Sequence, residues 1–165
     1  MRAALSLCML ALAGCAQPDS ALEAERQWRA CKDQDNPAAR VIACTRRLED
    51  PAAASADRVT ALLQRGDARL SQGNYVRAIA DYGRALRLDP VNTHALFQRG
   101  LAHFERGAFA VARADFAAVL AIDPANARAL HWRANAEQDL AERFERQLLS
   151  LSGQIAERPQ EASML

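Results

Sequence analysis

The chain has 165 residues, of which 25% are charged and 50% hydrophobic, and its formal net charge is +1. This length and composition fit one soluble globular domain and argue against disorder throughout the chain. Acidic residues are interleaved with the basic ones and no basic cluster stands out, so nucleic acid is not an expected partner.

An apolar segment opens the chain. Arg2 precedes residues 3–13, which are apolar except for Ser6. This stretch is too short to span a bilayer as a helix and suits the hydrophobic region of an export signal. The sequence therefore predicts a signal peptide over residues 1–14.

The segment ends in the four residues LAGC, the last of which is Cys15. These residues resemble the lipobox of bacterial lipoproteins. The resemblance implies cleavage just before Cys15, a diacylglycerol on its sulfur and usually an amide-linked acyl chain, with residues 15–19 as a tether. Two or more acyl chains hold a protein stably at a membrane. An ordinary signal peptide cut after Ala13 or Ala16 is the alternative.

Two short helices are expected over residues 20–50. Ser20 followed by Glu23 fits a capping box at the start of the first helix. Asn36 and Pro37 fit the N-cap and the first position of the second helix.

The four cysteines can be assigned by elimination. Cys8 leaves with the signal peptide and lipidation would use Cys15, so Cys31 and Cys44 remain as a pair in an oxidising compartment. A bridge between them would close a loop of about 14 residues and contribute roughly 3 kcal/mol. Two free buried cysteines are the alternative. The CxxC spacing of a metal site is missing.

Two segments of 34 residues, 59–92 and 93–126, superimpose without a gap. The matches include Leu62 with Leu96, Gly66 with Gly100, Gly73 with Gly107, Tyr82 with Phe116, and Asp89-Pro90 with Asp123-Pro124. This period and these residues resemble the tetratricopeptide repeat. The resemblance implies an all-α fold, a short α-solenoid of antiparallel helix pairs, in which residues 20–50 form a truncated first pair.

Individual repeat positions carry further expectations. Gly66 and Gly100 lie mid-helix, where glycine costs about 1 kcal/mol against alanine, so they indicate a close approach of the paired helix. Gly73 and Gly107 mark the turn inside each repeat. Where the family usually has large apolar residues, this chain has charged or polar ones, and packing there is expected to be looser or partly solvated: Arg65, Arg69, Arg99 and His103.

A single long helix is expected over residues 127–157, because no turn residue interrupts 127–151. Its apolar residues recur every three or four positions and form one stripe: Leu140, Phe144, Leu148, Leu151 and Ile155. We expect this helix to cap the array and residues 158–165 to be a disordered tail.

Candidate catalytic groups are absent from the sequence. The histidines His94, His103 and His131 are dispersed, with no cysteine or carboxylate at ligand spacing. No Ser/His/Asp set, nucleophile elbow or phosphate-binding loop is recognisable. The chain is therefore not expected to be an enzyme, to bind a metal or to carry a cofactor.

In the tetratricopeptide-repeat family the first helices of the repeats line a concave groove that holds a peptide or a partner's segment. The family's groove positions correspond here to Thr60, Leu63, Asp67, Leu70, Ser71, His94, Phe97, Leu101, Phe104, Glu105, Arg128, His131 and Asn135, with Trp132 near the edge. Phe97, Leu101 and Phe104 share a helical face that the repeat fold does not need to bury, which predicts a contact site. The chain's own C-terminal helix or a second copy, as a homodimer, are the alternatives to a foreign partner.

The sequence thus predicts a protein-binding adaptor, anchored through Cys15 and facing the periplasm. Ala16 in place of aspartate favours the outer over the inner membrane. Two alternatives remain open. One is an assembly factor, similar to the repeat lipoproteins that guide pilus or secretin assembly or dock cell-wall hydrolases; the other is a soluble periplasmic repeat protein without lipid.

Overall fold

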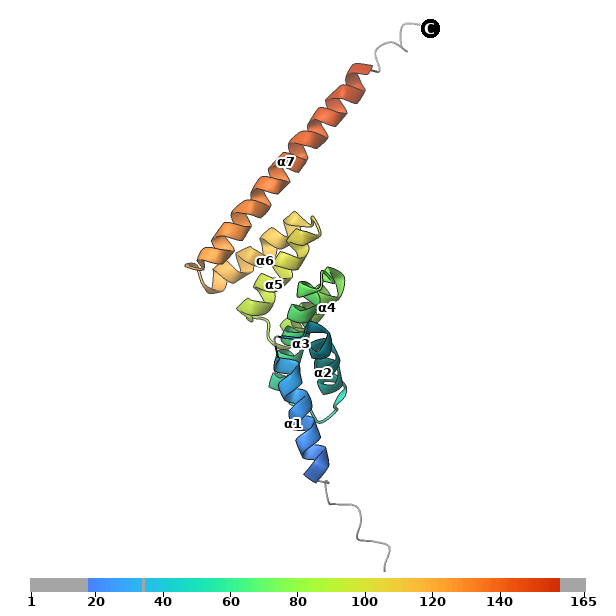
Figure 1. The fold of residues 1–165 in the computed structure, drawn as a ribbon. Coiled ribbons are helices and arrows are strands. Elements are labelled where there is room, and N and C mark those ends of the chain that lie inside the picture. The colour runs from blue at the N-terminus through green and yellow to red at the C-terminus, as the bar shows by residue number, and fades with distance from the viewer. Residues whose placement is uncertain (1–17, 34, 158–165) are drawn as a thin grey trace, which may run out of the picture.

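The computed structural model describes residues 18–33 and 35–157, and over these ranges the fold is all-α (Figure 1). The helices are α1 (Pro18–Lys32), α2 (Pro37–Glu49), α3 (Ser55–Ser71), α4 (Tyr75–Leu88), α5 (Thr93–Glu105), α6 (Phe109–Ile122) and α7 (Ala127–Glu157). Each packs mainly against its neighbours in sequence, as expected for a solenoid. Across these ranges, no helix has both the length and the hydropathy needed to cross a membrane. The predicted signal peptide, Cys15 and the C-terminal tail lie outside the described residues.

Helix starts agree only in part with the sequence prediction. The Asn36 side chain accepts a hydrogen bond from the Ala39 amide at 3.0 Å, so the predicted cap of α2 is confirmed. The predicted N-cap at Ser20 is wrong, because α1 already includes Pro18, whose fixed φ suits a first helical turn. Helix α3 starts at Ser55, four residues before the predicted repeat begins at Val59, and the alanines at 52–54 before it are not helical.

The turns inside the two repeats are built as predicted. Gly73 and Gly107 have φ angles of 70° and 71°, a left-handed conformation that glycine adopts without steric cost. The Gly73 amide donates to the Leu70 carbonyl at 2.9 Å and the next amide, of Asn74, donates to Arg69 at 2.8 Å. These bonds satisfy the carbonyls at the end of α3 and turn the chain into α4.

The mid-helix glycines allow an aromatic ring to pack against the helix backbone. A Cβ on Gly66 would lie 2.6 Å from Cε1 of Tyr82, and one on Gly100 would lie 2.8 Å from Cε1 of Phe116. Both rings are fully buried. The close approach predicted from the sequence is therefore confirmed, and these rings are what fills the space.

Gly66→Ala is expected to lower the free energy of unfolding by about 1–3 kcal/mol, because the added methyl overpacks the Tyr82 ring. Gly83→Ala is the matched control, since a Cβ on Gly83, also within a helix, would meet nothing within 4 Å. That control is expected to gain up to about 1 kcal/mol from helix propensity. Urea denaturation followed by circular dichroism measures both, and equal effects would contradict the packing argument.

A disulfide joins α1 to α2. Cys31 and Cys44 are bonded with a sulfur–sulfur distance of 2.07 Å and are both fully buried. They lie in a core cluster with Ala43 and Ala61, the latter on α3. The truncated first pair is thereby held together and stacked on the first full repeat.

The arginines at the atypical repeat positions do not loosen the packing, although Arg69 and Arg99 are partly solvated as predicted, with side chains 17% and 27% exposed. Asp81 on α4 is buried and binds two arginines of α3: Arg65 through bonds of 2.6 and 3.0 Å, and Arg69 at 2.5 Å. In the next repeat Arg99 binds Asp115 through bonds of 2.6 and 2.9 Å. Bidentate ion pairs of this kind are strong and geometrically specific. They hold α3 against α4 and α5 against α6.

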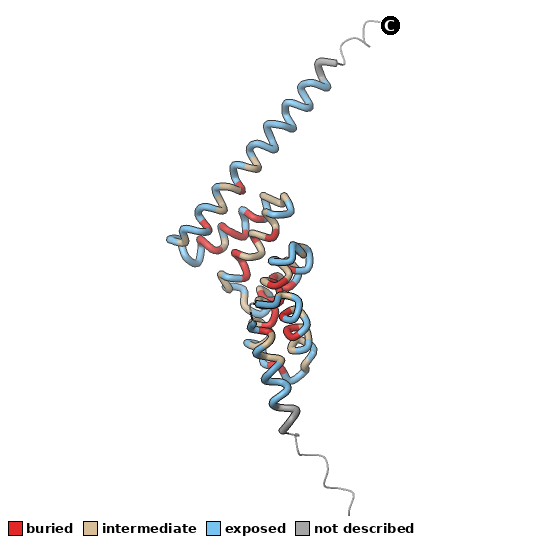
Figure 2. Tube along the Cα trace, in the orientation of Figure 1, coloured by how far each residue is buried: buried red, intermediate tan, exposed pale blue. Residues whose placement is uncertain are grey.

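Helix α7 acts as a cap over only part of its length. Its first turns pack on α6 and bury Ala129 and Ala136. Arg143 donates to the Gly107 carbonyl at 3.2 Å, and beyond this point α7 projects away from the array with its described side chains exposed (Figure 2). Of the predicted stripe, Leu140 is half-buried, Phe144, Leu148 and Leu151 are exposed, and the Ile155 side chain lies outside the described residues.

Candidate partner-binding face

The predicted groove residues lie on α3, α5 and α7, the first helices of successive pairs, and we call this surface the α3–α5–α7 face. Side chains of neighbouring helices meet across this face in two zones. A polar zone joins α3 to α5 through Asp67 and His94. An aromatic zone joins α5 to α7 through Phe104 and Trp132.

The polar zone is organised around the Asp67 carboxylate. It accepts hydrogen bonds from the Tyr82 hydroxyl at 2.7 Å, from His94 Nε2 at 3.0 Å and from Gln98 Nε2 at 3.4 Å. Burial, with a further contribution from Asp67, raises the pKa of the Tyr82 hydroxyl, which therefore stays protonated and donates. The hydrogen bond to Asp67 is the main cause that raises the pKa of His94.

The contribution of His94 to stability is expected to depend on pH. Its pKa is higher in the folded chain than the ordinary value of 6.5, so its contribution is complete below the unfolded pKa and is lost as pH rises through the folded pKa. The stability difference between wild type and His94→Gln should therefore be larger at about pH 5 than at about pH 9. Denaturation at both pH values measures it, with His131→Gln as the control; a difference independent of pH would contradict the ion pair.

The aromatic zone corrects one prediction. Phe97 is only 7% exposed and belongs to a core cluster with Phe116, its ring 5.6 Å away. Leu101 and Phe104 are half-buried against the same cluster. The predicted exposed apolar patch is wrong because Trp132 of α7 packs edge-on to Phe104, with ring centroids 5.2 Å apart, and covers this side of α5.

Charged and polar side chains stand above this aromatic zone. The Arg128 guanidinium lies 4.4 Å from the centroid of the Phe97 ring, a cation–π arrangement. His131 is exposed beside Trp132 and makes a hydrogen bond of 3.2 Å with Asn135. The remaining predicted residues divide by burial: Thr60, Leu63 and Leu70 are half-buried, while Ser71 and Glu105 are exposed. The face thus offers accessible polar groups over a partly buried apolar floor.

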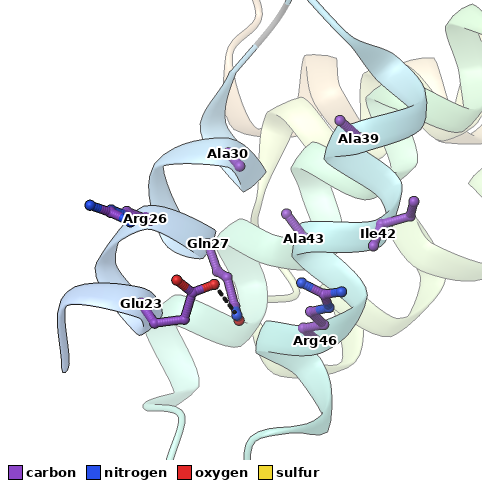
Figure 3. Close-up of a pocket in the computed structure, with 8 residues that line it drawn as sticks. All are labelled: Glu23, Arg26, Gln27, Ala30, Ala39, Ile42, Ala43 and Arg46. Carbon is purple, nitrogen blue, oxygen red and sulfur yellow. Dashed lines mark hydrogen bonds between the residues drawn. The ribbon is translucent and has the colours of Figure 1, made fainter. Parts of the chain in front are cut away.

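A shallow hollow lies elsewhere, between α1 and α2. Figure 3 shows its lining, which is Glu23, Arg26, Gln27, Ala30, Ala39, Ile42, Ala43 and Arg46. The only hydrogen bond among these side chains joins Gln27 to Glu23 at 3.1 Å. Three of its eight lining residues are alanine and its polar groups do not converge, so it lacks the arrangement of a small-molecule site.

The histidines do not come together. His94 and His131 lie on the α3–α5–α7 face, whereas His103 is half-buried near Asp115, and burial lowers its pKa. Among the described residues, no group of three or more His, Cys, Asp or Glu side chains is arranged to hold a metal ion.

Tyr82 and Gln98 also belong to the polar zone and were not among the residues predicted from the sequence. A signal for the first was present: Asp67 and Tyr82 occur together in one repeat, whereas Leu101 and Phe116 replace both in the other. A hydroxyl that appears only where its acceptor appears indicates a contact between the two positions.

Comparison with known proteins supports the fold. Residues 63–127 match the family model described as tetratricopeptide repeat, and no curated protein matches the chain. Among solved structures, the first TPR domain of human RPAP3 has a TM-score of 0.63 and 22% identity, over 78% of this chain and 98% of that domain. The Hsp90 co-chaperone Cns1 from Saccharomyces cerevisiae has a TM-score of 0.67 and 18% identity, over 90% of this chain and 47% of that one.

A third solved structure is a complex. The second TPR domain of human RPAP3, with the HSP70 peptide SGPTIEEVD, has a TM-score of 0.57 and 24% identity, over 69% of this chain and 98% of that one. Together with the helix arrangement, these likenesses confirm the predicted all-α solenoid, which resembles the tetratricopeptide-repeat fold.

Proposed function

We propose that this chain is an envelope adaptor that is anchored in a bacterial membrane through Cys15 and binds a segment of another protein on its α3–α5–α7 face. Tetratricopeptide-repeat folds serve protein–protein interaction. A similar domain from human RPAP3 was solved in complex with an HSP70 peptide, which supports peptide binding by this fold.

The observation that carries the proposal is the composition of the α3–α5–α7 face. Arg128, His131 and His94 are accessible above half-buried apolar side chains, and the nearby Asp67 carboxylate is already bonded by three donors. Glu105 is the exposed acid of this face, at the end of α5, whereas the charge directly over the apolar floor is the exposed Arg128 guanidinium. A peptide with acidic and apolar residues fits this surface, because charge gives specificity and apolar contact gives affinity.

Arg128→Glu tests the binding face. A photo-crosslinker at position 131 in living cells is expected to capture a partner protein, and Arg128→Glu is expected to abolish that capture. Arg113→Glu is the matched control, because Arg113 is an exposed arginine on α6, outside the face. Equal capture by both variants would reject the proposed face.

The membrane anchor rests on the sequence LAGC and is tested separately. Wild type is expected to enter the detergent phase on phase partitioning, and Cys15→Ser is expected to stay in the aqueous phase. If both proteins stay in the aqueous phase, the anchor proposal fails and the soluble periplasmic alternative is favoured. Separation of inner and outer membranes then locates the lipidated form, which we propose to be in the outer membrane.

A further inference from the structure

Helix α7 begins a fourth helix pair, and no second helix of that pair is present among the described residues. In the second repeat, Leu96 and Gly100 face α6 and are buried, Leu96 to 6% exposure. The equivalent positions on α7 are Leu130, which is 43% exposed, and Ala134, which is also exposed. They are uncovered because α7 continues as one helix to Glu157 instead of turning back.

An arginine of α7 also lacks the partner that its equivalents have in the two full repeats. Arg65 and Arg99 each bind an aspartate supplied by the second helix of their pair. Arg133 is the next residue in this series, and its one ion pair in the described chain is with Glu137 of the same helix, at 3.7 Å. Its Nε atom is buried and has no hydrogen-bond partner among the described residues. In both full repeats the aspartate follows the arginine by 16 residues, and the residue at this spacing from Arg133 is Leu149, which has no carboxylate.

The distal half of α7 carries an apolar surface that has no partner among the described residues. Phe144, Leu148 and Leu151 are 61%, 50% and 48% exposed. At 3.6 residues per turn, Leu148 points in the same direction as Leu130, five turns earlier. The uncovered site and the unpartnered stripe therefore lie on one face of one straight helix.

We propose that two copies of the chain associate by antiparallel pairing of α7, so that the distal half of each helix covers the Leu130–Ala134 site of the other. The direction matches the established packing, since the second helix of each pair runs antiparallel to the first. A straight helix cannot fold back on itself, so the covering segment comes from a second copy. A two-fold axis buries both surfaces at once, because each copy contributes the same pair of patches.

Charge complementarity supports this register. When Ala134 lies opposite Leu148 of the second copy, Glu145 of the second copy lies about one helical turn from the residue opposite Arg133. It thereby supplies the carboxylate that Asp81 and Asp115 supply in the two complete pairs. A foreign helix would cover one of the two patches and leave the other exposed.

The mass of the full chain in detergent micelles, measured by sedimentation velocity, tests the association. Wild type is expected to be a dimer, and Phe144→Glu/Leu148→Glu and Leu130→Glu are expected to be monomers with unchanged helicity. Val76→Glu is the matched control: Val76 is 61% exposed but lies on α4, which does not contact α7, so this variant is expected to stay dimeric. A monomeric wild type, or equal dissociation of all the variants, would overturn the proposal.

Cysteine crosslinking tests the direction of pairing. In the proposed register Leu148 of one copy lies opposite Ala134 of the other, whereas the two Leu148 residues are about 20 Å apart, too far for a disulfide. Ala134→Cys/Leu148→Cys is therefore expected to form a covalent dimer on oxidation, and Leu148→Cys alone is expected to match the wild-type background. Efficient crosslinking by the single variant would show a different pairing and reject the antiparallel one.

Discussion

Replacing Asp81 with asparagine is expected to lower the free energy of unfolding by about 3–5 kcal/mol, the cost of breaking a buried ion pair by removing one partner. The Asp81 side chain is 2% exposed and is bound by Arg65 and Arg69. An asparagine of the same shape leaves both guanidinium groups without their carboxylate and brings an amide donor toward them. The free energy of unfolding from urea titration measures the effect.

Asp35→Asn is the control for this substitution, because Asp35 is exposed and surface changes of this kind stay within about 0.5 kcal/mol. Asp115→Asn is expected to lower the free energy of unfolding by less than Asp81→Asn does. Its partner Arg99 is more exposed than Arg65, and His103 stands where the first repeat has Arg69. A loss below about 1 kcal/mol for Asp81→Asn would mean that the pair only offsets its own desolvation.

Removing the disulfide is expected to cost about 3 kcal/mol in the free energy of unfolding, because the bridge restricts a short loop in the unfolded chain. Cys31 and Cys44 are 13 residues apart and both are fully buried. Cys31→Ala/Cys44→Ala tests this, with thermal unfolding and urea titration as measurements. Hydrogen exchange is expected to rise chiefly in α1, since α1 packs mainly on α2.

A reducing agent provides the control for the disulfide prediction. Reduction of wild type is expected to reproduce most of the loss of the double variant, whereas the same reagent should leave the stability of the double variant unchanged. Equal stability of oxidised and reduced wild type would show that packing of α1 on α2, rather than the bridge, holds the first pair.

Part of the candidate face could be read from the repeat register alone. The register correctly placed Asp67, His94 and Arg128 on the first helices, because positions one repeat apart occupy equivalent sites in a solenoid. It could not tell which of these side chains remain accessible. Phe97 is buried because α7 brings Arg128 and Trp132 against α5, and that depends on contacts between residues far apart in sequence.

The burial of the arginine–aspartate pairs could not be predicted from the sequence either. Arg65 and Arg99 were visible as departures from the family pattern, and Asp81 and Asp115 recur at the same spacing. A charged residue in a repeat position is compatible either with solvent exposure or with a buried partner. The distance between the two side chains, which depends on how the helices pack, decides between them.

By itself, the sequence determined the two full helix pairs and their turns, and it identified the long C-terminal helix. Helical periodicity, the mid-helix glycines and the glycines at positive φ act over a few residues, so a single chain is enough to recognise them. The tertiary structure alone decided that Phe97 is core, that Asp81 binds two arginines, and that α7 leaves its distal half and its Leu130–Ala134 site uncovered. These features arise from packing between helices, and burial is a property of all the elements that surround a residue rather than of its local sequence.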